Sequence, residues 1–280
     1  MSEPHSLLPI ALWICGALVA PGGLPAQGAA GPHAQPALTV GSARVEGKLS
    51  SYFTSVARTL DPRPQAVLRR IPDRARRMLA VAEYLRRRHL VDTLWTWSAR
   101  EIRAHQKSEY YRRAMTELRR VKRTFATLNP GYVLVADTNG RGLPAQIAFW
   151  NRERSVAATA QELYDSSWAW LADDTYPGAP DSAALDRFLH QLAGYAPARH
   201  PTVAVPGLSL HGQLRAVDFA ILRRGRLVAG TMSATIDSVW DRGGWGERLR
   251  RAVTQAGSDF AGPLETPPEP WHYEYRPRTP

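Results

Sequence analysis

The spacing of apolar positions between residues 69 and 128 is that of amphipathic helices. Asp73 follows Pro72 and can cap a helix that runs through residues 74–90. A longer helix is predicted from about residue 93 to 128, where Asn129-Pro130-Gly131 ends it. Its apolar positions, at spacings of three, four or their sums, are Trp97, Ile102, Tyr110, Ala114, Leu118, Val121 and Phe125. We therefore expect a helical segment at 65–128, a hairpin that packs on the next domain.

From Tyr132 onward the pattern mixes short strands with helices. Residues 132–137 are predicted to form a strand, and 216–222 and 226–231 a hairpin around the Arg224-Gly225 turn. The predicted helices cover residues 145–171, 185–192 and 245–256. Because strands and helices do not alternate regularly, the pattern favours an α+β domain over residues 129–280.

The first 26 residues have the features of an export signal. Leu7–Ala20 is an uncharged run, too short to span a bilayer comfortably, and Leu24-Pro25-Ala26 offers a cleavage point. Cys15 leaves an uncleaved or lipidated anchor open as the alternative. Residues 27–64 are predicted to be a flexible linker with little order. The expected location is the periplasm or the cell envelope.

Charge is concentrated in the predicted helical segment. The 280 residues include 36 Lys or Arg and 25 Asp or Glu, a net charge of +11. Residues 69–128 hold seventeen basic and six acidic residues, so the net charge of this segment equals the net charge of the whole chain. Such a segment is either a solvated helix face or a surface for anionic envelope polymers or a membrane. Export argues against nucleic acid as the partner. The single cysteine excludes cysteine-ligated zinc and iron–sulfur sites.

A carboxylate stands in a strand that is otherwise apolar. Alternation places Asp218 on one face with its two alanine neighbours, and Val217 and Phe219 on the other. An unpaired buried charge costs several kcal/mol, so Asp218 needs a partner, and a metal ion would be one. His211 lies seven residues earlier, beside Gly212.

A second candidate segment lies near the C-terminus, at Glu269-Pro270-Trp271-His272. In a strand that starts here, His272 and Glu274 share one face, and the aromatic side chains take the other. Two histidines and one aspartate, His211, Asp218 and His272, make a three-ligand zinc set with a fourth position open for water, which is the catalytic pattern. Glu269 is then placed to carry the proton.

These segments resemble the motifs of the zinc D-alanyl-D-alanine carboxypeptidase and dipeptidase family of bacterial cell-wall metallopeptidases. The resemblance rests on Ser-x-His with a spacing of seven to Asp, on Glu-Pro-Trp-His, and on an Arg followed five residues later by Gln. Here these are Ser209, His211, Ala216 and Asp218, then Glu269 to His272, and Arg141 with Gln146. The match runs in the right order from about residue 132 to 275.

The resemblance implies the small fold shared with the hedgehog signalling domain, with zinc bound on an antiparallel sheet. It implies that Glu269 is the catalytic base. Arg141 would meet a negative group of the substrate, such as the terminal carboxylate of D-alanine. Gln146 and Ser209 would belong to the substrate-binding part of the site.

The chain departs from the family pattern around that pocket. Leu214 stands three residues after His211, where the family usually has Gly, and Gly140 and Gly142 flank Arg141 in place of Tyr and Ser. The expected function is an exported zinc metallopeptidase acting on peptidoglycan stem peptides, first of all a D-alanyl-D-alanine carboxypeptidase. Two alternatives stay open: an endopeptidase for D,D or L-alanyl-D-glutamate bonds, and a non-catalytic zinc-containing wall-binding protein.

Overall fold

The structure is a computed structural model that describes residues 40–278, which belong to one compact unit, Thr39–Pro280. The predicted signal at residues 1–26 and the first part of the predicted linker lie outside the described residues. Within the described part, no helix is both long and apolar enough to cross a membrane.

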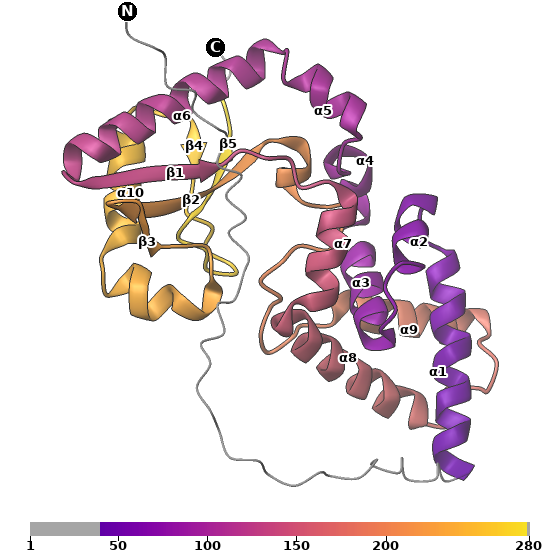
Figure 1. Ribbon diagram of the computed structural model, residues 1–280. Coiled ribbons are helices and arrows are strands. Elements are labelled where there is room, and N and C mark those ends of the chain that lie inside the picture. Colours follow the sequence, from indigo (N-terminus) through magenta and orange to yellow (C-terminus); the bar gives the residue numbers. More distant parts are fainter. Residues whose placement is uncertain (1–39, 279–280) are drawn as a thin grey trace, which may run out of the picture. The chain divides into compact units, whose positions relative to one another are not determined.

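The described chain is rich in helix and contains one small sheet, which confirms the α+β prediction (Figure 1). The α-helices are α1 (Val40–Arg58), α2 (Pro62–Leu68), α3 (Arg74–Arg86), α4 (Val91–Leu94), α5 (Ala99–His105), α6 (Glu109–Leu128), α7 (Leu143–Arg152), α8 (Arg154–Ala172), α9 (Ser182–Gly194) and α10 (Trp245–Gln255). The strands are β1 (Tyr132–Asp137), β2 (Ala216–Arg223), β3 (Arg226–Ala229), β4 (Phe260–Ala261) and β5 (His272–Tyr275).

The sheet is antiparallel at every pairing among the described strands, in the order β1-β2-β5-β4, with β3 paired to β2. Strand β2 is therefore the centre of the sheet. In its register Asp218 lies opposite Asp137 of β1 on one side and opposite His272 of β5 on the other. The topology thus brings together residues that are far apart in the sequence.

One face of the sheet is covered by α6 and α10. Val217, Phe219 and Ile221 of β2 are buried there with Tyr273 and Tyr275 of β5. The predicted alternation along β2 is confirmed, since the apolar side chains take this face and Asp218 takes the other. Burial of such aromatic and aliphatic side chains, each contributing about 1.5–3 kcal/mol, fixes the register of the two strands.

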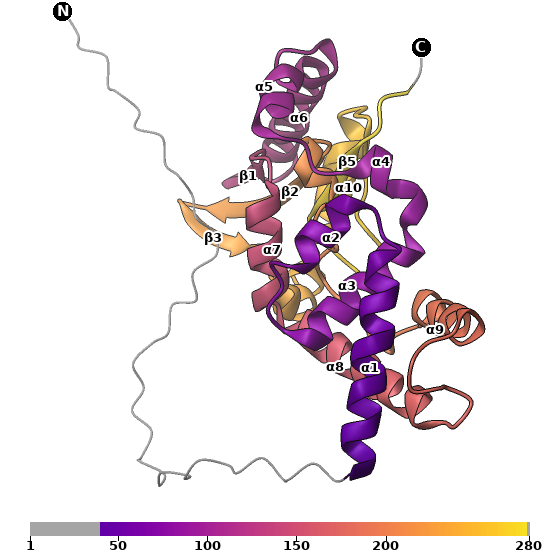
Figure 2. The same cartoon turned by 90° about the vertical axis from the view of Figure 1, so that its right-hand side faces the viewer.

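A second hydrophobic cluster is built from helices and the loops beside them, without any strand. Helix α3 is its centre and packs against α1, α8 and α9 (Figure 2). The predicted cap is confirmed: the Asp73 side chain accepts a hydrogen bond of 2.8 Å from the Arg76 backbone N–H. The predicted helix at 145–171 is present as α7 and α8, separated at Glu153, whose side chain caps α8.

The prediction of a poorly ordered linker at 27–64 is wrong for residues 40–58, which form α1. Leu49, Tyr52 and Val56 on one face of α1 are fully buried, and the Tyr52 hydroxyl donates to the Pro177 carbonyl oxygen at 3.2 Å. The helix is poor in strong local signals, because it contains Gly47 and several serines, and its stability comes from tertiary packing.

The expected helical hairpin at 65–128 is also wrong. The predicted helix at 93–128 is interrupted twice, and Ser98 and Ser108 cap the new starts of α5 and α6. Helix α3 belongs to the helical cluster, whereas α6 packs on the sheet and on α10. The segment is therefore shared between two hydrophobic clusters of one compact unit, with no boundary at residue 129.

Candidate metal centre

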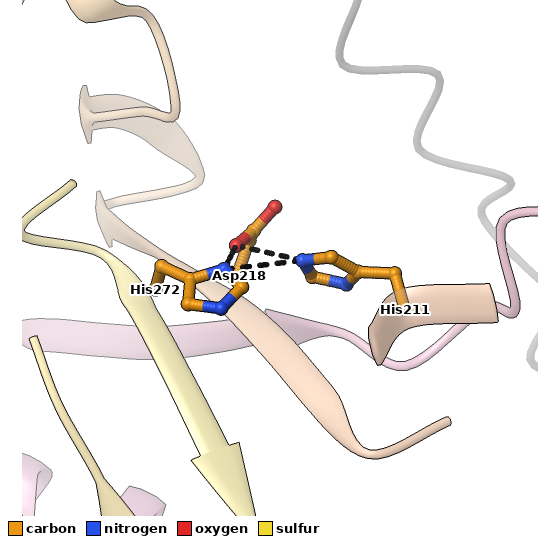
Figure 3. Close-up of side chains that lie close together, drawn as sticks. All are labelled: His211, Asp218 and His272. Carbon is orange, nitrogen blue, oxygen red and sulfur yellow. Dashed lines mark hydrogen bonds and ion pairs between the residues drawn. The ribbon is translucent and has the colours of Figure 1, made fainter. Parts of the chain in front are cut away.

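Three buried polar side chains from three elements converge on one point (Figure 3). His211 comes from a single 3-10 turn at Leu210–Gln213, Asp218 from β2 and His272 from β5. His211 Nε2 lies 3.3 Å from Asp218 Oδ1 and 3.2 Å from His272 Nδ1, and the last two atoms are 3.1 Å apart. The predicted ligand set is thus assembled in space.

The sheet and one turn position these ligands. Asp218 and His272 are direct partners across the antiparallel pair of β2 and β5, and the Phe219 N–H donates to the Trp271 carbonyl oxygen at 2.9 Å beside them. His211 sits just before β2, and the Arg215 N–H closes its turn on the Leu210 carbonyl oxygen at 3.0 Å. The backbone therefore holds all three side chains in place.

The geometry fits a metal ion. In a tetrahedral site with bonds of about 2.0–2.1 Å, the ligand atoms are about 3.3 Å apart, close to the separations found here. Each of the three residues offers one atom, so His211, Asp218 and His272 could hold a metal ion and leave a coordination position free.

The three groups shift one another's pKa values. Burial lowers the pKa of His211. Burial also opposes protonation of His272, but the contacts with Asp218 and Glu274 outweigh it and raise the pKa of His272 to about 9. Burial raises the pKa of Asp218, yet the neighbouring His211 and other positive partners hold it well below its usual range. A carboxylate thus faces the imidazoles, and a bound cation would replace the proton on His272.

Glu269 lies beside this triad, as the sequence predicted. Its Oε2 is 3.6 Å from His272 Nδ1, and its side chain is only 14% exposed. The Glu269 N–H donates to the Leu264 carbonyl oxygen at 2.9 Å, which anchors the segment. Burial raises the pKa of Glu269 to about 7. A nearby cation would favour the carboxylate and lower this value.

Arg141 also contacts the candidate metal centre, through the Asp218 carboxylate. Its guanidinium pairs with Asp218 Oδ2 and lies 3.7 Å from Asp137 Oδ2. The backbone N–H of Arg141 donates to the His211 carbonyl oxygen at 3.3 Å, which ties its loop to the ligand turn. Arg141 was expected to face a substrate group, and in this structure it pairs with the second oxygen of the Asp218 carboxylate.

Gln146 and Ser209, the other two residues predicted to contact substrate, lie around the centre. Gln146 is buried: its amide nitrogen donates to the Arg141 carbonyl oxygen at 2.5 Å and to Thr96 Oγ1 at 2.7 Å. Its amide oxygen accepts from the Gly207 N–H at 2.8 Å. Gln146 therefore holds three loops together behind Arg141. Ser209 is partly buried and precedes the His211 turn.

Two residues in and after the His211 turn occupy positions that suit glycine. Leu214 adopts a left-handed conformation with φ of 54°, which is where a glycine would be unstrained and another residue costs about 1–2 kcal/mol. Its buried side chain offsets this cost. Gly212 permits a close approach, because a Cβ there would lie 2.4 Å from Thr96 Oγ1 and 2.8 Å from Gln146 Nε2.

Two acidic residues near the candidate metal centre, Glu274 and Asp137, were not predicted from the sequence to have a role. Glu274 Oε1 lies 3.9 Å from His272 Nε2, the nitrogen that faces away from the triad, and His272 lowers the pKa of Glu274 to about 2. A carboxylate behind a ligating histidine orients the ring. The sequence signal for this contact is the position of Glu274 two residues after His272, on the same face of a strand. Asp137, which faces Arg141, gave no local signal because only the sheet register brings it to Asp218.

Comparisons of the chain with protein-family models, with curated proteins and with solved structures found no match. The interpretation of the centre therefore rests on its own geometry and on the motif resemblance.

Proposed function

We propose that this protein is an exported zinc metallopeptidase that hydrolyses peptide bonds in peptidoglycan stem peptides, with D-alanyl-D-alanine carboxypeptidase as the first candidate. The observation that carries the proposal is the triad of ligand atoms at 3.1–3.3 Å with the Glu269 carboxylate 3.6 Å from one of them. A metal ion with a proton carrier beside its ligands is what metal-assisted hydrolysis requires.

The donor set supports zinc. Two imidazole nitrogens and one carboxylate with an open position are typical of catalytic zinc, and the same set also suits non-haem iron(II). The buried carboxylate of Glu269 favours zinc, because hydrolysis uses a proton carrier at this place. When bound, zinc supplies a Lewis acid and lowers the pKa of a coordinated water.

The residues of the chain then have distinct tasks. Glu269 Oε2 accepts a proton from the attacking water and returns it to the amine nitrogen as the C–N bond breaks, so the carboxylate is unchanged at the end. Glu274 holds the ring of His272 from behind. Arg141 keeps Asp218 charged and faces the negative end of the substrate.

The position of Arg141 also supports the endopeptidase alternative. Its guanidinium is already paired with Asp218 and close to Asp137, so a terminal carboxylate of the substrate has to share it. An endopeptidase for D,D or L-alanyl-D-glutamate bonds needs no such contact. Unchanged activity in an Arg141→Ala variant on cross-linked substrates would favour this alternative.

The test is mass spectrometry of defined muropeptides, monomeric and cross-linked, after incubation with the zinc-loaded protein. Loss of one alanine from a pentapeptide supports the carboxypeptidase, and conversion of dimers to monomers supports the endopeptidase. A Glu269→Gln variant should keep its zinc and lose activity by about 10²- to 10⁴-fold, the usual contribution of a general base. Full zinc occupancy with no hydrolysis of either substrate would leave the non-catalytic wall-binding protein.

The basic residues support a contact with anionic polymers of the envelope, but only in part of the segment. Arginines of α3 serve the fold: Arg76 donates to the Trp150 and Glu153 carbonyl oxygens, both at 3.3 Å. On α6, Arg119, Arg120 and Arg123 are exposed. We propose the polymer contact on this part of α6.

Co-sedimentation with isolated cell-wall sacculi at low and high salt tests this contact. Reversal of Arg119, Arg120 and Arg123 to Glu should weaken binding at low salt about tenfold or more, and added salt should remove the difference. The matched control reverses three exposed arginines of the β2–β3 hairpin, Arg223, Arg224 and Arg226. Equal losses in both triple variants would contradict a specific face, and binding to anionic lipid vesicles alone would assign it to a membrane.

A further inference from the structure

A pocket of about 270 Å³ adjoins the metal centre and belongs to none of its ligands. One wall comes from the middle of the basic segment 69–128, at and just before α5, and the floor comes from the loops that carry Arg141 and His211. The residues that line the pocket include Trp97, Ile102, Arg103, Gly140, Gly142 and Gly212.

The pocket shares its backbone with the centre. Gly212 directly follows the ligand His211, and Gly140 and Gly142 flank Arg141. The two loops are joined by the hydrogen bond from the Arg141 N–H to the His211 carbonyl oxygen at 3.3 Å. A peptide whose reacting carbonyl lies at the metal therefore places a neighbouring residue within reach of this pocket.

Glycines keep the floor of the pocket open. A Cβ on Gly142 would meet only Pro144 Cδ, at 3.8 Å, so a larger residue fits the backbone there and its side chain would take up free space. A Cβ on Gly140 would lie 3.2 Å from Leu214 Cδ2 and 3.4 Å from Ile102 Cδ1, which close that side. Gly140, Gly142 and Leu214, at which the chain departs from the family motif, thus all lie in or against this pocket.

The lining defines the chemistry of the ligand. Trp97 and Ile102 supply apolar walls, and Arg103, exposed on α5, is the only charged residue among the described residues that line the pocket. An aliphatic stem fits between the walls, and a terminal anion complements Arg103.

We propose that this pocket binds a side chain with an aliphatic stem and a terminal carboxylate, belonging to the substrate residue next to the scissile bond. The inference rests on the proposed peptidase function and, among its candidates, favours the L-alanyl-D-glutamate endopeptidase, because both residues of D-alanyl-D-alanine have only a methyl side chain. Arg103 and Ile102 are then specificity-determining residues outside the metal centre.

Binding and hydrolysis are measured separately. The binding probe is a series of stem-like peptides that carry Glu, Gln or Ala next to the scissile bond, titrated into the zinc-loaded Glu269→Gln variant. Glu should bind about three- to tenfold more tightly than its isostere Gln, the range expected for one partly solvated charge contact. Equal affinity for Glu and Gln would overturn the proposal.

Variants of the pocket locate the effect. Arg103→Gln should abolish the preference for Glu over Gln, while the matched control Arg100→Gln, an exposed arginine of the same helix that does not line the pocket, should keep it. Ile102→Trp, which fills the pocket, should weaken binding of the Glu peptide about tenfold and leave zinc affinity unchanged. A preference that persists in both Arg103→Gln and Ile102→Trp would place it elsewhere.

The two hypotheses fail in different ways. A Glu preference in binding that depends on Arg103, without hydrolysis by the wild-type protein, would support the pocket and contradict the peptidase. Hydrolysis at equal rates for Glu, Gln and Ala peptides, unaffected by Ile102→Trp, would support the peptidase and contradict the pocket.

Discussion

Buried charges have different partners in the helical cluster and in the sheet. In the helical cluster, the Lys48 ammonium donates to the carbonyl oxygens of Leu171 at 3.0 Å and Asp173 at 3.2 Å, where α8 ends. The Glu83 carboxylate pairs with Arg86 at 2.6 Å and with Arg87 at 2.9 Å. Each buried charge there has its own complementary partner, and these contacts stabilise the fold.

In the sheet, Asp218 has a complementary partner, Arg141, only at Oδ2. Its Oδ1 lies against both His211 Nε2 and His272 Nδ1, and these two nitrogens are 3.2 Å apart, so an N–H on each of them would bring two hydrogens toward each other. A cation bound between the three atoms would take a lone pair from each of them. We interpret the first group of contacts as part of the fold and the second as a candidate site, and the variants below test that division.

The largest effect is expected from a ligand. A His272→Ala variant should lose zinc affinity by more than about 100-fold, beyond what loss of an outer-sphere partner typically costs. Isothermal titration calorimetry with zinc measures it. His190→Ala, which removes an exposed histidine of α9, is the matched control and should bind zinc as the wild type does. Equal zinc affinity of the wild type and the His272→Ala variant would contradict the site.

The next effect belongs to the helical cluster. Lys48→Met keeps the length of the side chain but leaves two carbonyl oxygens without their donor, so the free energy of unfolding should fall by about 2 kcal/mol. Urea unfolding measures this, with Lys107→Met at an exposed position as control. Zinc affinity should not change. A lower zinc affinity with intact stability would break the division between the two regions.

A smaller effect is expected behind the metal ligand. Glu274→Gln keeps the shape of the side chain but removes the charge that faces His272 Nε2, so zinc affinity should fall about tenfold. The control is Glu247→Gln on α10, whose partner Arg250 lies on the surface. Equal calorimetric affinities for the two variants would show that Glu274 does not orient His272.

The smallest effect is expected on the exposed face of α6. Arg119 contacts Thr116 on its own helix, so Arg119→Gln should change the free energy of unfolding by less than about 0.5 kcal/mol. Urea unfolding of this variant beside Lys48→Met completes the series. A loss as large as that of Lys48→Met would mean that α6 uses its charges for the fold, as α3 does.

The sequence predicted the features that local chemistry determines. The Asp73 cap, the alternation along β2 and the mixture of strands and helices all follow from short-range patterns. The grouping of His211, Asp218 and His272 was also predicted, from residue types and motif spacing, and the structure brings them together.

What the sequence did not predict depends on long-range contacts. Helix α1 is stabilised by packing against α8 and α9, which no local signal shows. Ser98 and Ser108 cap α5 and α6. They lie within a series of apolar residues at helical spacing, so the apolar positions alone predict one uninterrupted helix. The role of Gln146 depends on Thr96 and Gly207, which the fold brings to it from two distant segments.

The most direct test of the central claim is zinc-edge X-ray absorption of the full-length protein, desalted after loading with one equivalent of zinc. The account predicts retained zinc with two imidazole nitrogens and oxygen ligands at about 2.0–2.1 Å, and loss of one imidazole in the His272→Ala variant. Zinc lost on desalting, or a spectrum that the His272→Ala variant does not change, would contradict a metal centre at His211, Asp218 and His272.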